Sequence, residues 1–153
     1  YLPTLLAIVS NLTQPALCVG DGAHLISDTF LERQMVNSDG ITATMLESPL
    51  NLYSGDTLVF LITYQNTGCQ DINGFTVTSR IPKSLVYKGS LNSSALVSTD
   101  EGKNWSQDTK IQLSHAKGTN AWQKKSITHV KWQEEKILKA HDRAFLMFRA
   151  VVR

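Results

Sequence analysis

The segment from Thr57 to Gln65 constrains the fold more than any other part of the sequence. Its apolar residues fall on both phases of a two-residue repeat. One face would carry Leu58, Phe60, Ile62 and Tyr64, and the other Val59, Leu61 and Thr63. A strand that is apolar on both faces is typical of the centre of a sheet with packed surfaces. The segment therefore predicts a central β-strand in a domain with a sizeable core.

The same two-residue periodicity extends from Ile41 to the end of the chain. We expect eight strands, at Ile41–Glu47, Thr57–Gln65, Gly74–Arg80, Leu85–Lys88, Ala95–Thr99, Lys110–Leu113, Thr128–Gln133 and Ala144–Val152. Turn residues separate these segments, and Asn37-Ser38-Asp39-Gly40 is the strongest turn signal. Regular turns without intervening helices predict an all-β antiparallel sandwich of seven or eight strands. In the last strand, Arg149 is expected to point outward near a rim.

Composition agrees with a packed domain, because 42% of the 153 residues are apolar and 18% are charged. The charge is unevenly distributed. Residues 1–100 contain 4 Lys/Arg and 8 Asp/Glu, whereas residues 101–153 contain 11 and 5. Such asymmetry can indicate an anionic partner, but no run reaches the five or six like charges of a binding tail. We therefore interpret the lysines as solvated residues and expect no nucleic-acid partner.

Residues 1–20 have two interpretations that the sequence leaves open. They fit the end of a secretory signal peptide, and they equally fit an N-terminal extension that forms part of the fold. The apolar run is too short for a membrane-spanning helix, which needs about 20 apolar residues. Residues 21–40 are expected to be a connector, either a short helix or an extended approach to the sandwich, and residues 41–153 the domain itself.

The two cysteines, Cys18 and Cys69, have neither CxxC spacing nor a histidine at a metal-ligand distance in the sequence. They would form one disulfide in an oxidising compartment if both belong to the mature chain. They would stay separate if Cys18 lies in a segment that is removed. The sequence leaves this choice open.

Several short motifs follow one another in an order found in a bacterial surface-protein repeat. They are Ser54-Gly55-Asp56, then Thr63-Tyr64-Gln65-Asn66-Thr67-Gly68, then Ile81-Pro82-Lys83-Ser84-Leu85-Val86-Tyr87, then Lys88-Gly89-Ser90, Val130-Lys131-Trp132 and the closing Ala144–Val152. In this order they resemble the repeat known as the DUF11 domain, over residues 41–153. The resemblance implies an immunoglobulin-like β-sandwich from a bacterial cell envelope, and it implies no reaction.

The residues that carry the resemblance also have structural interpretations of their own. Gly55 and Gly68 would permit turn conformations that other residues avoid, and Asn66 would bond neighbouring backbone where a strand ends. Pro82 would end strand pairing because it has no N–H to donate. Asp56 completes the first turn, and the rings of Trp132 and Tyr64 suit burial between two sheets. The segment Lys139-Ala140-His141-Asp142 departs from the usual Pro-Gly turn, and we expect the Asp142 side chain to close it.

The segment Ser98-Thr99-Asp100-Glu101-Gly102-Lys103-Asn104-Trp105 fits the Asp-box pattern of sialidase propellers. In that pattern Asp100 accepts backbone hydrogen bonds, Gly102 takes a strained conformation and Trp105 packs beneath the turn. One copy cannot build a propeller, so we interpret the segment as a structural hairpin. A less favoured alternative is a Ca²⁺ site formed by Asp100, Glu101 and Asp108.

The sequence contains no nucleophile elbow, no HExxH pair of histidines and no phosphate-binding glycine loop. We therefore expect a noncatalytic module with no cofactor and no metal, exported to the periplasm or cell surface. Its partner would be a protein or a polysaccharide of the envelope, bound by end loops at 89–94 and 114–126 or by an exposed sheet edge. The alternative is a small carbohydrate-binding module in which Trp122, with Lys124 and Lys125, contacts the sugar. The oligomeric state is not predicted.

Overall fold

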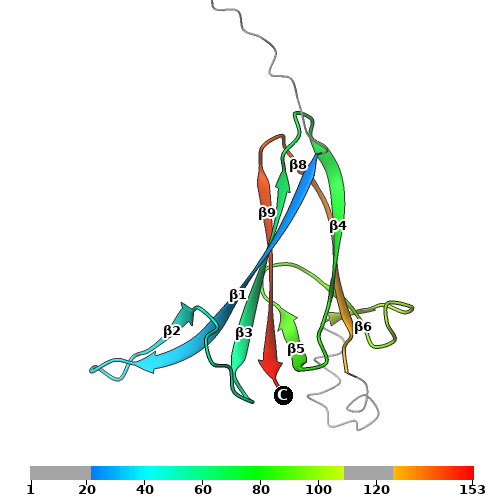
Figure 1. Ribbon diagram of the computed structural model, residues 1–153. Helices are drawn as coiled ribbons and strands as arrows, with labels where there is room; N and C mark the ends of the chain where they lie inside the picture. Colours follow the sequence, from blue (N-terminus) through cyan, green and yellow to red (C-terminus); the bar gives the residue numbers. More distant parts are fainter. Residues whose placement is uncertain (1–21, 109–125) are drawn as a thin grey trace, which may run out of the picture.

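A computed structural model describes residues 22–108 and 126–153. The described residues form two antiparallel β-sheets that pack face to face, as Figure 1 shows, and they contain no helix. This confirms the predicted all-β sandwich. One sheet has the order β2-β1-β3-β9-β5 and the other has the order β4-β8-β6-β7.

Nine strands are described, and most fall where the sequence predicts them. Their bounds are β1 Ala23–Val36, β2 Thr42–Glu47, β3 Thr57–Asn66, β4 Ile72–Arg80, β5 Leu85–Ser90, β6 Leu96–Ser98, β7 Ser106–Gln107, β8 His129–Leu138 and β9 Arg143–Val152. β3 is central, as its two apolar faces predict, because it pairs with β1 on one side and β9 on the other. The strand expected at Lys110–Leu113 lies outside the described residues.

The core lies between the sheets and centres on Trp132 of β8, which is completely buried. Its ring is tilted against Phe148 of β9 with 5.8 Å between centroids, and its indole N–H donates to Ser90 Oγ at 3.0 Å. Tyr64 is half-buried and stacks on Phe75 of β4 at 4.3 Å, which joins the two sheets at the other end. The inward face of β3 is the one that carries Leu58, Phe60, Ile62 and Tyr64.

Residues 23–36, which the sequence predicts to belong to a connector, form the longest of the described strands. β1 pairs with β3 from Ala23↔Asn66 to Glu32↔Thr57, and with β2 from Leu31↔Glu47 to Val36↔Thr42. The prediction of a connector at 21–40 is thus corrected over this range. Apolar residues fall in adjacent pairs on β1, so its sequence shows neither a two-residue nor a helical period.

The turns correct two further expectations. The Lys139–Asp142 turn is closed by the backbone N–H of Asp142, which donates to Lys139 O at 3.1 Å, and not by the Asp142 side chain. His141 takes φ of 67° there, a left-handed conformation that usually favours glycine. Gly68 does not have a positive φ; it is needed for space, because an added Cβ would lie 3.2 Å from Gly22 Cα.

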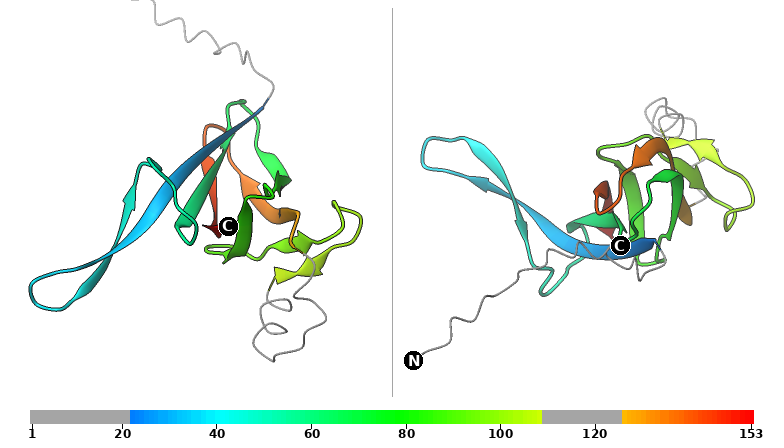
Figure 2. Two further views of the ribbon diagram at one scale, coloured as in Figure 1. Left: turned by 60° about the horizontal axis from the view of Figure 1, so that its bottom comes forward. Right: turned by 90° about the horizontal axis from the view of Figure 1, so that it is seen from above.

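The far end of β1 leaves the body of the sandwich. Past Glu32, β1 has no pairing with β3, and its last four residues pair with β2 alone. Residues 33–47 therefore form a two-stranded hairpin, which we call the arm. Figures 1 and 2 show it extending away from the body of the sandwich, at the end of the molecule opposite the β8–β9 turn.

Candidate interaction surface

The arm is a well-formed hairpin with a fixed tip. Asn37 N–H donates to Ile41 O and Gly40 N–H donates to Asn37 O, both at 3.0 Å. The Asn37 side chain adds two bonds, because its Oδ1 accepts from Asp39 N–H at 3.0 Å and from Ile41 N–H at 2.8 Å. Gly40 has φ of 77°, as the Asp-Gly turn signal predicts. The tip is thus ordered by its own hydrogen bonds rather than by packing.

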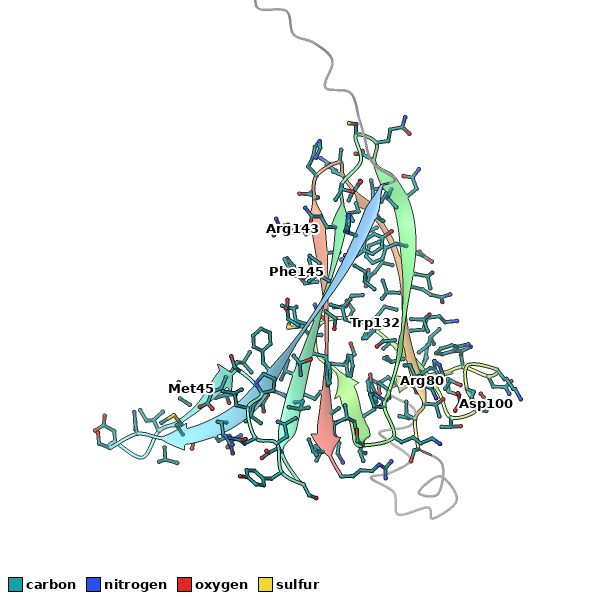
Figure 3. The ribbon with its side chains drawn as sticks, in the orientation of Figure 1. Met45, Arg80, Asp100, Trp132, Arg143 and Phe145 are labelled. Carbon is teal, nitrogen blue, oxygen red and sulfur yellow. The ribbon has the colours of Figure 1, made fainter. Side chains whose placement is uncertain are left out.

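The arm and the loop that follows it expose large apolar side chains to solvent. Every residue of β2 is exposed, and Met45, marked in Figure 3, lies well outside the core. The exposed large apolar residues of this region are Met35, Val36, Ile41, Met45, Leu46, Leu50, Leu52 and Tyr53. Apolar residues gathered in this way mark a surface that contacts something else.

Two ion pairs tie the base of the arm to the sandwich. Arg149 Nε donates to Glu32 Oε2 at 2.8 Å, and this bond joins β9 to β1 across the intervening β3. Arg33 lies 3.7 Å from Asp56 Oδ1, in the turn before β3. Arg149 therefore points to the outer face of its sheet, as predicted. The base of the arm is fixed to the body while its apolar residues stay exposed.

The residues that carry the family resemblance hold the body together. Asn66 is fully buried, and its Nδ2 lies 2.8–3.1 Å from the carbonyl oxygens of Gln70, Leu138 and Lys139. Its Oδ1 accepts from Gly68 N–H at 3.0 Å. Asn66 thus joins the end of β3 to the turn after β8, a long-range role that its sequence neighbours do not reveal.

The remaining structural residues also occupy turns. Gly55 has φ of 93°, and the Asp56 carboxylate accepts from Tyr53 N–H at 2.9 Å. The turn docks on the last strand, since Gly55 N–H donates to Val152 O and Val152 N–H donates to Asp56 O. Pro82 follows the end of β4 at Arg80, as its missing N–H predicts.

The turn contacts expected for Ser98–Trp105 are present. Asp100 Oδ1 accepts from the backbone N–H of Asn104 and from Ser98 Oγ, each at 2.8 Å. These bonds, with the Asn104 bonds the largest cause, hold the pKa of Asp100 well below its ordinary value. Gly102 has φ of 85° and faces the Trp105 ring, over which Lys131 Nζ lies 4.1 Å from the centroid. Asp100 serves the turn; Figure 3 places it at the edge of the molecule.

Asp108 is buried in a polar network and not beside Asp100. Its Oδ2 accepts from the Tyr87 hydroxyl and from Ser90 N–H, both at 3.0 Å. Burial, together with the nearby Asp108 carboxyl, raises the pKa of the Tyr87 hydroxyl well above its ordinary value. In the described ranges no three His, Cys, Asp or Glu side chains gather as metal ligands, so the alternative of a Ca²⁺ site finds no support there.

A cleft of about 710 Å³ lies beside this network. Small hydroxyl and amide side chains form much of its wall, among them Ser93, Ser94, Gln107 and Gln133.

The sequence-predicted contact residues Trp122, Lys124 and Lys125 lie outside the described residues, as does most of the loop at 114–126. The loop at 89–94 is described, and Asn92 in it bonds to Phe145 O and Met147 N–H of β9.

Cys69 is disulfide-bonded, and Cys18, the other cysteine of the sequence, lies outside the described residues.

No protein-family model, no curated protein and no solved structure matches this chain. Within residues 22–108 and 126–153, no helix is long and apolar enough to cross a membrane.

Proposed function

We propose that the protein is a noncatalytic interaction module of a bacterial cell envelope, and that its arm is the contact surface. The observation that carries this proposal is the exposure of the apolar side chains of residues 33–53 on an ordered hairpin. A hairpin of two strands is marginally stable by itself, so a protein that keeps one projecting into water benefits when a partner covers it.

The envelope location is supported by the resemblance to a bacterial surface repeat and by the bonded state of Cys69. Disulfides persist in the periplasm and outside the cell, and they are rare where thiols are kept reduced.

The noncatalytic part of the proposal is supported by the structural hydrogen bonds that the buried and turn polar residues make. Asn66, Asp100 and Asp108 are engaged in bonds that hold turns and strands, which is a structural use of each.

The experiment places a photo-reactive amino acid at Met45 in cells that produce the protein, with the same probe at Thr78 as a control. Thr78 is exposed on β4, on the other sheet. Crosslinks to a protein of the envelope from position 45, but not from position 78, are the expected result. Equal crosslinking at both positions, or none at 45, would contradict the proposal.

A second candidate function is binding of a polysaccharide. It is favoured by the cleft of about 710 Å³, whose hydroxyl and amide side chains suit sugar hydroxyl groups. Retention on polysaccharide gels should then fall when Ser93 and Gln133 are both changed to alanine. Trp122→Ala tests the sequence-predicted contact in the same assay. Unchanged retention in both variants would exclude this candidate.

A further inference from the structure

The strand edges of the sandwich carry features that hinder pairing with another chain, and β2 is the exception. β5 has a bulge between Tyr87 and Gly89, and the β4–β8 ladder has a register shift at Asn73–Phe75, with the extra residue in β8. β7 has only two residues, Asn92 covers part of the β9 edge, and Asp28 stands in the part of β1 that pairs with β3 but not with β2. Bulges, short strands and charges are the usual means of protecting an edge.

β2 has none of these devices along most of its length. Its sequence is Thr42-Ala43-Thr44-Met45-Leu46-Glu47, with the charge at the end, no proline, no glycine and no shift of register against β1. Within the described part of the chain, β2 pairs on one side only. An exposed, regular and largely apolar edge of this kind is a template for a further strand.

The backbone groups on this edge alternate in a known way. Asn37 N–H donates to Ile41 O, so Asn37 and Ile41 form a hydrogen-bonded pair. In an antiparallel ladder such pairs recur at every second residue, so Ala43 and Met45 bond to β1. Thr42, Thr44 and Leu46 therefore direct their N–H and C=O groups outward. Three successive donor–acceptor positions are available to an incoming strand.

A second copy of β2 is electrostatically compatible with this edge. A two-fold axis through the sheet makes the two β2 strands antiparallel and keeps corresponding faces on the same side. Centred on Thr44, such pairing sets Glu47 opposite Ile41 of the other copy; centred on Met45, it sets Glu47 opposite Ala43. Neither register opposes two carboxylates, and Arg33 and Glu32 are already paired within the chain.

The size of the surface also suits a second copy. Specific interfaces use about 20–30 residues from each partner. The arm and the loop to Asp56 provide residues 33–56, in which eight large apolar side chains are exposed. Pairing of two arms would give a four-stranded sheet, which is stable where an isolated hairpin is not. Closed two-fold contacts are also the commonest form of self-association.

We infer that two copies of this chain associate through their arms, with β2 paired edge to edge and antiparallel about a two-fold axis at Thr44 or Met45. The inference rests on the proposed function, because it names the partner of the same surface. The exposed β2 side chains of one copy then lie beside those of the other. Figure 2 shows the arm projecting from the body of the sandwich.

The test is sedimentation equilibrium of the purified full chain over a range of concentrations. The wild-type chain and Thr44→Val, which keeps the outward N–H, are expected to dimerise. Thr44→Lys and Thr44→Glu bring like charges together across the axis, directly opposite when the axis lies at Thr44 and diagonal when it lies at Met45, and each is expected to weaken dimerisation at least about tenfold. An equimolar mixture of the Lys and Glu variants should restore it, because opposite charges then face each other. Circular dichroism checks that the variants remain folded.

Restoration in the mixture is specific to a two-fold contact that brings the two copies of this residue together. A monomeric wild-type chain at all concentrations overturns the inference, and so does a dimer that neither charge variant weakens. If both charge variants dimerise more weakly and their mixture does not recover, the arm contacts a different surface of the other copy, and the inference is also overturned. If the chain is monomeric while position 45 still crosslinks to another envelope protein in cells, the proposed function stands and only the self-association fails. If position 45 crosslinks to nothing, the proposed function fails as well.

Discussion

Leu31 and Met35 lie on the same face of β1, four residues apart, yet one is buried and the other is exposed. Leu31 is 2% exposed and packs in the core, whereas Met35 is 52% exposed on the arm. Both residues are paired in a regular antiparallel ladder. The difference is the second sheet, which covers the body and does not reach the arm. Hydrogen-bonded pairing alone therefore does not make a core; a facing layer is needed.

The largest expected difference between body and arm concerns side-chain removal. Trp132→Ala should lower the free energy of unfolding by about 3–5 kcal/mol, because it empties a fully buried site against Phe148. Met45→Ala on the arm should change it by less than about 0.5 kcal/mol when the chain is monomeric. Urea titrations of both variants at low protein concentration measure the two values. Similar losses for both would show that the arm is packed in solution.

The body could be predicted well from the sequence because alternation reports which face of a strand is buried. Trp132 is buried, Asn66 bonds backbone where β3 ends, and β3 is a central strand, as the motifs indicate. The arm could not. Ile41, Met45 and Leu46 have the composition of core residues, and nothing in a local pattern tells whether a second sheet lies above them. β1 was missed for a related reason, since it changes partners from β3 to β2 along its length.

The next largest effect is expected at Asn66. Asn66→Ala removes the amide that bonds to the carbonyls of Gln70, Leu138 and Lys139 at the end of β3. Leaving such groups unpaired costs about 1–3 kcal/mol. The matched control is Gln34→Ala, which removes an exposed amide from the arm and should have little effect. Thermal unfolding of both variants is the measurement, and an equal change in the melting temperature would contradict the structural role of Asn66.

A smaller effect, with a pH dependence, is expected at Tyr87. Its pKa is raised above the ordinary value of 10.0 by burial and by Asp108. Its contribution to stability is therefore fully present below about pH 10 and is lost as the pH rises further, because the unfolded chain ionises first. Tyr87→Phe should cost about 1 kcal/mol at pH 7, since Asp108 keeps its bond from Ser90 N–H.

The comparison for Tyr87 is a denaturant series at pH 7 and above pH 10. The wild-type chain should lose more stability over this interval than Tyr87→Phe does. Tyr53→Phe serves as the control variant, because Tyr53 is exposed beside the arm. Equal alkaline losses in wild type and Tyr87→Phe would show that the buried phenol is not responsible.

The smallest expected effect is a difference in how the stability of two exposed turns depends on pH. One turn is on the body and the other is at the tip of the arm. Asp100 and Asn37 each accept two or more bonds within their own turn. The low pKa of Asp100 means that its contribution is present above about pH 3.8 and is lost as the pH falls below that value. Asn37 does not titrate. Wild type and Asp100→Asn should therefore converge in stability in acid, whereas wild type and Asn37→Ala should keep a constant difference from pH 7 to pH 3. A difference between wild type and Asp100→Asn that stays constant over this range would mean that the carboxylate charge does not stabilise its turn.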